Sequence, residues 1–484
     1  MNVPMFSMLD VMALAPELFL LAATCVILLA DLFIGQSRRI VTHLLSVAVL
    51  LLTAVLVWRS QHTGVAGTAF DGMYLLDGLA GLLKVFLLGV SALVLIYAKP
   101  YLQRQQLFSG EFYLLVLFAV LGMMLQVSSG NLLMLYLGLE LMSLSSYALV
   151  ALQRDNSKAS EAAMKYFVLG ALASGLLLYG ISLLYGATGT LQLDELAAAS
   201  AVGYERGLLA FGLVFVVVGV AFKLGVVPFH MWLPDVYEGS PTAVTLFIAA
   251  APKIAAFGML YRLLANGLPA MGDSWTVMLG MLAVASMGLG NVFALAQKNL
   301  KRMLAYSTIS HMGFLLMGMV AARESGYAAA TFYAVTYSLA TAAAFGAMLA
   351  LRRSGVEIEK IDDLRGLNAQ HPWLALLLLA VMASLTGIPG FVGFTAKVLV
   401  IKSALDADML WLAIAAVAFA VVGAFYYLRV IKVMYFDQPI EGSAFEVAED
   451  RTLRVVLGGN GIALVALFLF GAPLLAWCVD AFAI

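Results

Sequence analysis

Long apolar runs separated by short polar segments recur along the whole chain. A helix needs about 20 predominantly apolar residues to cross the hydrocarbon core of a bilayer. Runs of this kind begin near Ala15, Ile40, Leu75, Phe112, Leu132, Ala159, Gly207, Thr242, Trp275, Ala305, Gly326, Trp373, Met409 and Val456. The pattern predicts an all-α polytopic membrane protein with about fourteen transmembrane helices, which we number as spans in chain order.

Composition agrees with a membrane protein. Hydrophobic residues make up 63% of the 484 residues, and the mean hydropathy is +0.99. Charged residues make up 11%, against about 25% in ordinary soluble domains. Because the runs follow one another closely, we expect a single transmembrane domain over residues 1–484. Its expected parts are three N-terminal helices in 1–105, a first repeat in 106–270, a second repeat in 271–440 and a C-terminal helix in 441–484.

The sequence does not indicate a site for a bound cofactor. Cys25 and Cys478 lie at opposite ends of the chain and fit neither a disulfide framework nor an iron–sulfur or zinc spacing. The five histidines are scattered, no glycine-rich phosphate loop follows a strand pattern, and the formal net charge is −1. We therefore expect no metal, no cofactor and no nucleic-acid partner for this chain.

The positive charges of the loops predict an orientation, because cytoplasmic loops carry an excess of Lys and Arg. Loops after odd-numbered spans hold Arg38, Arg39, Lys99, Arg104, Arg154, Lys158, Lys298, Lys301, Arg302, Arg352, Arg353, Lys360, Arg365, Arg451 and Arg454. Loops after even-numbered spans hold little beyond Arg59, Arg206, Arg262, Arg323 and Lys402. The odd loops are therefore expected in the cytoplasm, and both termini outside, in the periplasm of a bacterium with its inner membrane as the host bilayer.

Three prolines interrupt the apolar runs. Pro228 lies in "VVVGVAFKLGVVPFHMWLPD" of the seventh span, Pro252 in "FIAAAPKIAAFGML" of the eighth, and Pro389 in "TGIPGFVGFTAK" of the twelfth. Proline clashes with the carbonyl four residues back, so Pro228 is expected to free the carbonyl of Leu224. Broken helices at depth are tolerated only where they are buried in protein or line a water-filled cavity. Breaks at spans seven and twelve, five spans apart, predict two inverted five-helix repeats, spans four to eight and nine to thirteen.

Four ionisable residues lie well inside the apolar runs. They are Glu140 in the fifth span, Lys223 in the seventh, Lys253 in the eighth and Lys397 in the twelfth. Ionisable side chains at membrane depth are rare and usually mark ion pathways. Burial opposes the charged form of such groups, while an opposite charge nearby favours it. A Glu and a Lys that approach and separate can therefore act as a proton switch, and we predict that these four residues carry protons.

A second group of residues is expected to connect these four. Lys165 and Lys301 lie near the cytoplasmic ends of their spans. His230 and His311 are candidate relays because histidine titrates near neutral pH. Lys84 is central in the third span but lies outside the repeats, so we expect a structural role for it.

Structural roles are the alternative for several of these side chains. Glu140 could bond to the serines between Ser143 and Ser146 and serve packing alone. Lys397 lies near the outer end of its span, where a lysine can extend its charged group to the interface. A lone buried histidine can equally be a packing residue with satisfied hydrogen bonds.

Three longer stretches resemble a known family. They are "AFKLGVVPFHMWLPDVYEGSPTAVTLFIAAAPKIAAF" (Ala221 to Phe257), "QKNLKRMLAYSTISHMGFLLMG" (Gln297 to Gly318) and "IDDLRGL" (Ile361 to Leu367). Together with the pattern of spans, they resemble the antiporter-like proton-channel subunits of respiratory complex I, NADH:quinone oxidoreductase, over nearly the whole chain.

Bacterial members of this family are of three types, called L, M and N. Subunit M is expected to carry Glu where this chain has Lys397, and subunit L has extra spans and a lateral helix after the bundle. The "APELFLL" opening (Ala15 to Leu21) is similar to subunit N. The resemblance is therefore to the subunit N type.

The resemblance implies a proton-pumping module of a translocase that couples electron transfer from NADH to quinone to proton movement. NADH, FMN, iron–sulfur clusters and quinone would be bound by other subunits. The partners would be the other membrane subunits of the complex and the lipid bilayer.

The resemblance also implies roles at matching positions. Glu140 would be the modulating acid and Lys223 its partner. Lys253 would be the central relay and Lys397 the outlet residue. The connecting sites would be His230, Lys165, Lys301 and His311.

Other functions remain open at this point. A subunit of a cation/proton antiporter or of a membrane-bound hydrogenase from the same superfamily would share every intramembrane charge. A secondary solute transporter should show polar, unwound backbone shaped for a solute, whereas here the polar groups near the midplane are mainly single titratable residues. A scaffold that only completes an assembly would tolerate replacement of the lysines.

Overall fold

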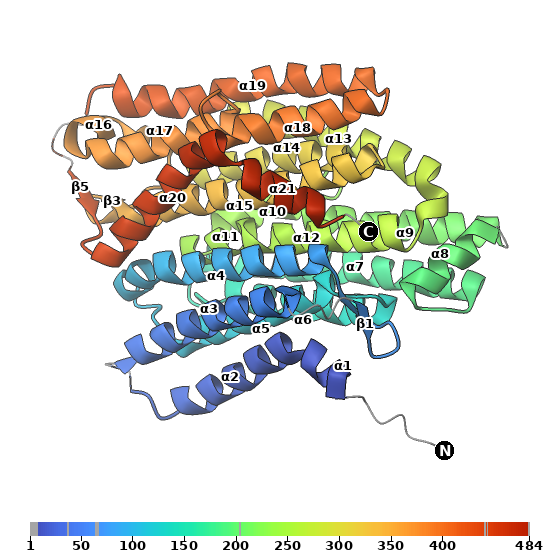
Figure 1. Cartoon of the computed structure of the whole chain (residues 1–484). Coiled ribbons are helices and arrows are strands. Elements are labelled where there is room, and N and C mark those ends of the chain that lie inside the picture. Colours follow the sequence, from blue (N-terminus) through green and yellow to red (C-terminus); the bar gives the residue numbers. More distant parts are fainter. Residues whose placement is uncertain are drawn as a thin grey trace.

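The computed structural model describes residues 8–35, 38–62, 67–202, 205–439, 442 and 444–482. Helices run side by side as one bundle, with strands and connecting segments gathered at its two ends (Figure 1). The first seven and the last two residues lie outside the described ranges. The expected periplasmic position of both termini therefore stays a prediction.

The N-terminal part lies along one side of the bundle (Figure 1). Its helices are α1 (Met8–Ala13), α2 (Ala15–Asp31), α3 (Ile40–His62) and α4 (Gly78–Arg104). An antiparallel hairpin of β1 (Gly67–Ala69) and β2 (Tyr74–Leu76) joins α3 to α4. Asp77 caps α4, because its carboxylate accepts the backbone N–H of Ala80.

The first expected repeat contains both long helices and short ones. They are α5 (Gly110–Val127), α6 (Leu132–Val150), α7 (Ser157–Thr188), α8 (Leu193–Val202), α9 (Arg206–Leu224), α10 (Trp232–Gly239), α11 (Thr242–Ala249) and α12 (Ala251–Tyr261). A π-helical turn, Arg262–Asn266, continues α12, and a 3₁₀ turn, Pro269–Met271, leads into the next helix.

The second expected repeat and the C-terminal part complete the bundle. Their helices are α13 (Gly272–Ala296), α14 (Leu300–Val320), α15 (Glu324–Ala350), α16 (Leu367–Gln370), α17 (Pro372–Thr386), α18 (Val392–Asp406), α19 (Leu410–Tyr435), α20 (Arg451–Phe470) and α21 (Ala472–Asp480). A three-stranded sheet at one end places β3 (Leu351–Arg353) between β4 (Val356–Glu357) and β5 (Phe445–Val447). A 3₁₀ turn, Ile361–Leu364, follows β4.

The all-α membrane class is confirmed. In the described part of the chain, 12 helices are long and apolar enough to cross a membrane. The two remaining apolar runs are the one from Ala15, which forms the 17-residue α2, and the one from Trp373, which is divided between α17 and α18. The count of fourteen spans and the inverted repeats stay predictions.

The seventh span is broken as expected, but glycine rather than proline ends its first half. α9 stops at Leu224 because Gly225 takes a left-handed conformation with φ of 78°, which glycine adopts without a Cβ clash. The chain is then non-helical until α10 begins at Trp232. Pro228 lies inside this break, so the expectation that Pro228 itself frees the Leu224 carbonyl is wrong. The Leu224 carbonyl is open because the helix has already ended.

The twelfth span has the same construction. α17 ends at Thr386, Gly387 follows with φ of 88°, and α18 begins at Val392. Pro389 lies between the two halves. The expected breaks at spans seven and twelve are therefore both present.

The eighth span is also divided. Ala250 separates α11 from α12 with φ of −105° and ψ of −84°. Pro252 occupies the second position of α12, where its missing N–H is not needed by the helix. The Ala250 carbonyl accepts the Ser338 hydroxyl of α15 at 3.1 Å, so this break is tied to a neighbouring helix.

Close backbone contact between neighbouring helices depends on glycine. A Cβ on Gly122 of α5 would lie 2.6 Å from the Gly138 carbonyl of α6. A Cβ on Gly313 of α14 would lie 2.7 Å from the Ala283 carbonyl of α13. Small residues that let backbones approach are typical of helix pairs in membranes. These two pairs occupy matching positions in the two predicted repeats.

The eighth span, α14 and α15 are the best-buried part of the bundle. The apolar windows of Thr242–Asn266, Leu300–Val320 and Glu324–Ala350 are each 94% buried, whereas those of α19 and α20 are 33% buried. α11, α12, α14 and α15 thus form the centre, and α19 and α20 lie at the periphery. Polar groups on the central helices are screened from lipid by the outer ones.

Lys84 of α4 takes part in a buried ion pair. Its Nζ lies 2.5 Å from the carboxylate of Glu17 on α2 and donates to the Tyr74 hydroxyl at 2.7 Å. Glu17 and Lys84 are 2% and 4% exposed. The pair joins the first long helix to the bundle, which supports the expected structural role of Lys84.

The glycine contacts give a stability prediction. Gly122→Ala should lower the thermal unfolding midpoint, because the added methyl must push two helix backbones apart at a cost of about 1–3 kcal/mol. Gly89→Ala in α4 is the matched control, since a Cβ there meets nothing within 4 Å. Heating detergent-extracted native membranes and measuring how much of the chain stays soluble compares the two. Equal midpoints for both variants would contradict the close α5–α6 contact.

Candidate functional site

The break after α9 holds a lysine from another helix. Lys253, in the first turn of α12, donates from Nζ to the Leu224 carbonyl at 3.0 Å and to the Lys223 carbonyl at 3.3 Å. The last carbonyls of a helix have no partner within the helix, and they carry the negative end of its dipole. A buried ammonium, 1% exposed in the case of Lys253, is well placed at this end.

The side chain of Lys223, the residue before the end of α9, extends to α6, the fifth span. Its Nζ donates to the Ser143 hydroxyl oxygen of α6 at 2.6 Å. The Ser143 hydroxyl in turn donates a hydrogen bond to the Leu139 carbonyl at 2.5 Å, one turn back in the same helix. The backbone of Lys223 thus contacts Lys253 while its side chain contacts α6, so the two lysines share one site.

Glu140 lies one turn before Ser143 on α6 and faces α7. Its carboxylate accepts a hydrogen bond from the Ser174 hydroxyl, which also lies 3.1 Å from the Tyr136 hydroxyl. The described residues show no direct ion pair between Glu140 and Lys223. Ser143, which accepts from Lys223, lies three residues after Glu140 on α6. The structure therefore places Lys223 against the turn of α6 that follows Glu140, and not in direct contact with Glu140 itself.

The packing alternative for Glu140 named the wrong serines. Ser143, Ser145 and Ser146 donate to carbonyls of their own helix, those of Leu139, Leu141 and Met142. The hydroxyl that reaches Glu140 comes instead from Ser174 on α7.

Aromatic rings enclose the two lysines. Lys223 Nζ lies 5.6 Å from the centre of the Tyr147 ring, and Lys253 Nζ lies 5.4 Å from that of Trp232. Trp232 is stacked on Tyr166 at 4.6 Å and donates from its indole nitrogen to the Phe222 carbonyl at 2.9 Å. Rings at this distance attract a cation through their electron-rich faces. They stabilise an ammonium here without presenting a counter-charge.

Lys301 repeats the arrangement at the end of another half-helix. It lies in the first turn of α14 and donates from Nζ to the Ser240 carbonyl at 3.2 Å. Ser240 directly follows α10. Lys301 is 5% exposed, so a second buried ammonium lies at an open helix end.

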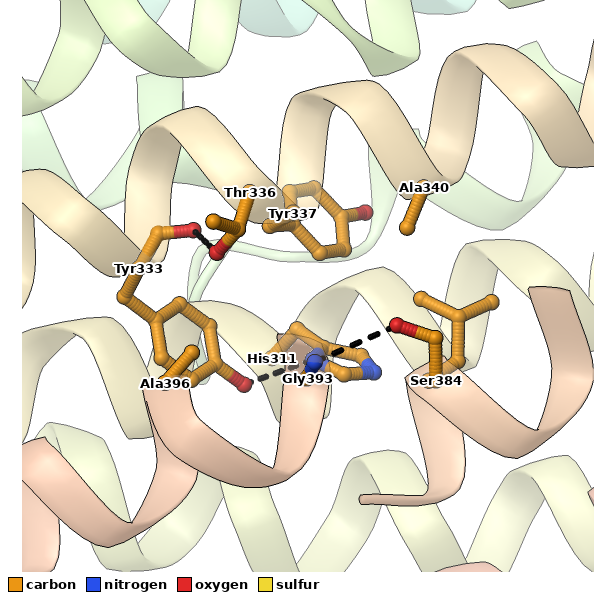
Figure 2. A pocket seen from close by; sticks show the side chains of 9 residues that line it. His311, Tyr333, Thr336, Tyr337, Ala340, Ser384, Gly393 and Ala396 are labelled. Atoms are coloured by element: carbon orange, nitrogen blue, oxygen red, sulfur yellow. Dashed lines mark hydrogen bonds between the residues drawn. The ribbon is translucent and has the colours of Figure 1, made fainter. Parts of the chain in front are cut away.

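His311 of α14 lies between two tyrosines. Its Nδ1 is 2.6 Å from the Tyr333 hydroxyl, and its Nε2 is 3.0 Å from the Tyr427 hydroxyl. Figure 2 shows the histidine bonded to Tyr333, and both residues line a small cavity together with Ser384. The cavity volume is about 10 Å³, close to the least that one water molecule requires. His311 thus lies in a polar, hydrogen-bonded position rather than in an apolar one.

Lys397 of α18 lies close to this cavity, because it directly follows the lining residue Ala396. Its Nζ donates to the Thr386 carbonyl at 2.8 Å and to the Leu385 carbonyl at 3.0 Å, the last carbonyls of α17. Phe314 places its ring 5.0 Å from the ammonium. Leu385 also lines the cavity beside His311. Lys397 is 8% exposed, so it does not extend its charged group to the interface.

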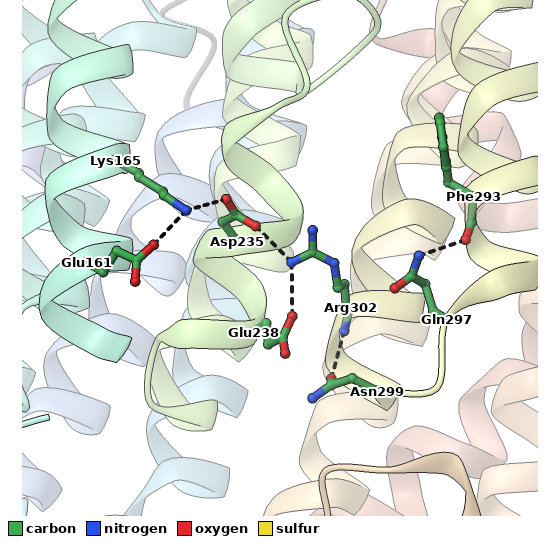
Figure 3. Close-up of polar contacts among 8 residues, drawn as sticks. All are labelled: Glu161, Lys165, Asp235, Glu238, Phe293, Gln297, Asn299 and Arg302. Atoms are coloured by element: carbon green, nitrogen blue, oxygen red, sulfur yellow. Dashed lines mark hydrogen bonds and ion pairs between the residues drawn. The ribbon is translucent and has the colours of Figure 1, made fainter. Parts of the chain in front are cut away.

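Lys165 lies elsewhere, in a surface ion-pair network (Figure 3). It is 43% exposed and lies 2.8 Å from both Glu161 and Asp235. Arg302 of α14 extends the network, with ion pairs to Asp235 at 2.8 Å and Glu238 at 2.9 Å. These contacts join α7, α10 and α14 at one end of the bundle. They do not place Lys165 beside the buried lysines.

His230 lies half-buried in the break between α9 and α10. Among the hydrogen bonds of the described residues, none joins its side chain to Glu140 or to one of the buried lysines. The structure therefore brings Lys223 and Lys253 together and places Lys397 near His311, while Lys165 and His230 stand apart.

Sequence reasoning missed several hydroxyl groups of the site. Ser174, Tyr333 and Tyr427 gave no signal, because their partners lie on other helices. Ser143 did carry one, since it lies three residues after Glu140 and so on the same helix face.

Comparison with protein families gives one match. Residues 129–423 match the family described as NADH:quinone oxidoreductase/Mrp antiporter, TM. The matched segment contains Glu140, Lys223, Lys253 and Lys397.

Similar proteins cover almost the entire chain. NADH-quinone oxidoreductase subunit N of Xanthomonas euvesicatoria pv. vesicatoria is 54% identical over 474 residues, which are 98% of this chain and 97% of that protein. NADH-quinone oxidoreductase subunit N of Herminiimonas arsenicoxydans is 50% identical over 486 residues, covering 98% of each.

Solved structures show the same fold. A chain of respiratory complex I from Thermus thermophilus is 32% identical, with a TM-score of 0.80 over 95% of this chain and 98% of that one. A chain of the Mrp complex from Dietzia sp. DQ12-45-1b has a TM-score of 0.83 at 23% identity, over 98% of this chain and 97% of that one. The latter likeness concerns the fold alone.

Proposed function

This chain belongs to the NADH-quinone oxidoreductase subunit N family, and from that premise we propose that it is a proton-translocating membrane subunit of a bacterial respiratory complex I. The observation that carries the proposal is the shared site at the α9 break, where Lys253 binds the carbonyl of Lys223. Two titratable side chains at one buried helix end suit the transfer of a proton. They give no means of binding a solute.

The physical basis is a balance at each buried lysine. Burial favours the neutral amine, whereas the carbonyl end of a helix and nearby aromatic faces favour the ammonium. A lysine held between these tendencies can gain and lose a proton when a nearby charge changes. Glu140 is placed to supply that change to Lys223, because it lies three residues before Ser143, the α6 residue that Lys223 contacts.

We propose an order of transfer along these residues. Glu140 acts as the modulating acid and Lys223 as the residue that it modulates. Lys223 releases its proton toward Lys253, the central relay. Lys301 and His311 then connect this half of the bundle to Lys397, the outlet residue, through the tyrosine hydroxyls around His311.

In this proposal the chain has no redox site of its own. Reduction of quinone by NADH takes place on other subunits, which bind FMN, the iron–sulfur clusters and quinone. The chain contributes to the translocase by moving protons, and its partners are the other membrane subunits and the bilayer.

The relatives favour this function over its rivals. A cation/proton antiporter subunit shares the fold, but the Mrp chain is 23% identical, against 54% for subunit N of Xanthomonas euvesicatoria pv. vesicatoria. A solute transporter would need unwound backbone open to a ligand, whereas the breaks at Leu224 and Thr386 have their carbonyls bound by lysines. A scaffold would have no need of these buried charges.

The same proposal includes location and orientation. The excess of Lys and Arg in the loops after odd-numbered spans supports a bacterial inner membrane protein with those loops in the cytoplasm and both termini in the periplasm.

Labelling of single cysteines tests the orientation. Ser354→Cys, between β3 and β4, and Asp194→Cys, in α8, are both exposed positions, and Cys25 and Cys478 would be replaced by serine. A membrane-impermeant maleimide should label position 354 only from the cytoplasmic face and position 194 only from the periplasmic face. Labelling of both from one face would contradict the proposed orientation.

Replacement of Lys223 tests the proposed function. Lys223→Arg keeps a charge that can bond to Ser143, but arginine does not release its proton in a protein. Proton pumping per assembled complex should fall about tenfold or more. Lys402→Arg, at an exposed lysine of α18, is the matched control and should pump normally. Pumping must be measured in membranes where assembly is verified, and wild-type pumping by assembled Lys223→Arg would show that the charge is structural.

A further inference from the structure

The segment after β4 lies against the beginning of α14. The Leu300 N–H donates to the Glu359 carbonyl at 2.7 Å, and the Ile361 N–H donates to the Lys298 carbonyl at 2.9 Å. Asn299 and Lys360 form an antiparallel bridge between these two bonds. This pairing fixes the β4 residue Glu357 close to the buried end of α14, where Lys301 lies.

Glu357 is half-buried and has two hydroxyl partners. One carboxylate oxygen accepts the Thr242 hydroxyl at the start of α11, and the other accepts the Tyr101 hydroxyl of α4 at 3.2 Å. The Tyr101 oxygen in turn accepts the Thr242 N–H at 3.2 Å. The carboxylate is therefore held in one position where α4, α11 and β4 meet at the end of the bundle.

Glu357 and Lys301 bind the two ends of one short turn. Lys301 donates to the Ser240 carbonyl, and Glu357 accepts from Thr242, two residues further on. The Ser240 hydroxyl lies 2.8 Å from the Thr245 hydroxyl, which adds hydroxyl groups beside the turn. A half-buried acid is thus held two residues along the chain from the carbonyl that a buried lysine binds.

The charges around this pair come from several elements. Arg352 is the cross-strand neighbour of Glu357 in the β3–β4 hairpin, and Glu238 and Glu359 lie near enough to Lys301 to act on it electrostatically. Tyr101 is the titratable group contributed by α4. When Glu357 is protonated, its carboxylate loses its negative charge. Transfer of that proton to Lys301 restores the negative charge on Glu357.

We propose that Glu357 is the residue through which protons from the surrounding water reach Lys301, and through it the buried lysines. This inference rests on the proposed function. In the step, the carboxyl O–H bond of Glu357 breaks and an N–H bond forms on the Lys301 amine, so a neutral pair becomes an ion pair. Protons from water then reload Glu357, and no oxidant or reductant takes part.

The test replaces Glu357 by glutamine in membranes with verified assembly of the complex. Glu357→Gln keeps an oxygen acceptor for Thr242 or Tyr101 but does not titrate, and should lower proton pumping about tenfold. Glu446→Gln in β5, an exposed acid on the other side of Arg352 in the same sheet, is the matched control and should pump normally. Glu357→Asp, which still titrates, should recover part of the loss.

A pH series separates proton loading from a structural role. If Lys301 must take protons directly from water in Glu357→Gln, the deficit relative to wild type should shrink as the pH on the uptake side is lowered. A deficit that stays constant with pH, or one equally present in Glu446→Gln, would overturn the inference.

Lys253→Met distinguishes failure of this inference from failure of the proposed function. If Lys253→Met abolishes pumping while Glu357→Gln pumps as wild type does, Glu357 is not the entry residue and the proposed function stands. If assembled Lys253→Met itself pumps normally, the proposed function fails and the inference fails with it.

Discussion

An ammonium group bound to the open carbonyl end of an interrupted helix is the interaction on which the rest of this structure depends. Lys253 binds the end of α9, Lys397 binds the end of α17, and Lys301 binds the end of α10. Without the breaks these carbonyls would be bonded within their helices, and the lysines would have no acceptors at that depth. The glycines that end α9 and α17 therefore decide where the buried charges can lie.

The magnitudes explain why such pairs suit a proton carrier. A lysine at the centre of a bilayer costs about 2.5–3.5 kcal/mol on insertion scales, and a buried amide group without a partner costs about 2–7 kcal/mol, depending on the reference state. Bringing the ammonium to the carbonyls offsets both costs. Burial continues to oppose the charge, while the carbonyls favour a lysine that donates to them. In the proposed function, a change in one nearby charge shifts this balance and moves the proton.

Much of this arrangement could be predicted from the sequence, because apolar runs, prolines and charges at depth are local features. The breaks near Pro228 and Pro389 and the burial of Lys253 followed from them. The acceptors did not, since which carbonyl a lysine reaches depends on how separate helices pack. Lys165 and Lys301 looked alike in sequence, yet one lies in a surface network and the other at a buried helix end. Only the fold distinguishes them.

Proton pumping by Lys253→Arg tests the central claim most directly. Arginine can donate to the carbonyls of Lys223 and Leu224, so the end of α9 should remain bound and the complex assembled, but arginine does not release its proton. Lys432→Arg, at a lysine of α19 that is 67% exposed, controls for the substitution itself. The account predicts an assembled Lys253→Arg complex with thermal stability near that of wild type and little proton translocation. Wild-type translocation by that assembled complex would contradict it, because the lysine would then only hold the helix end.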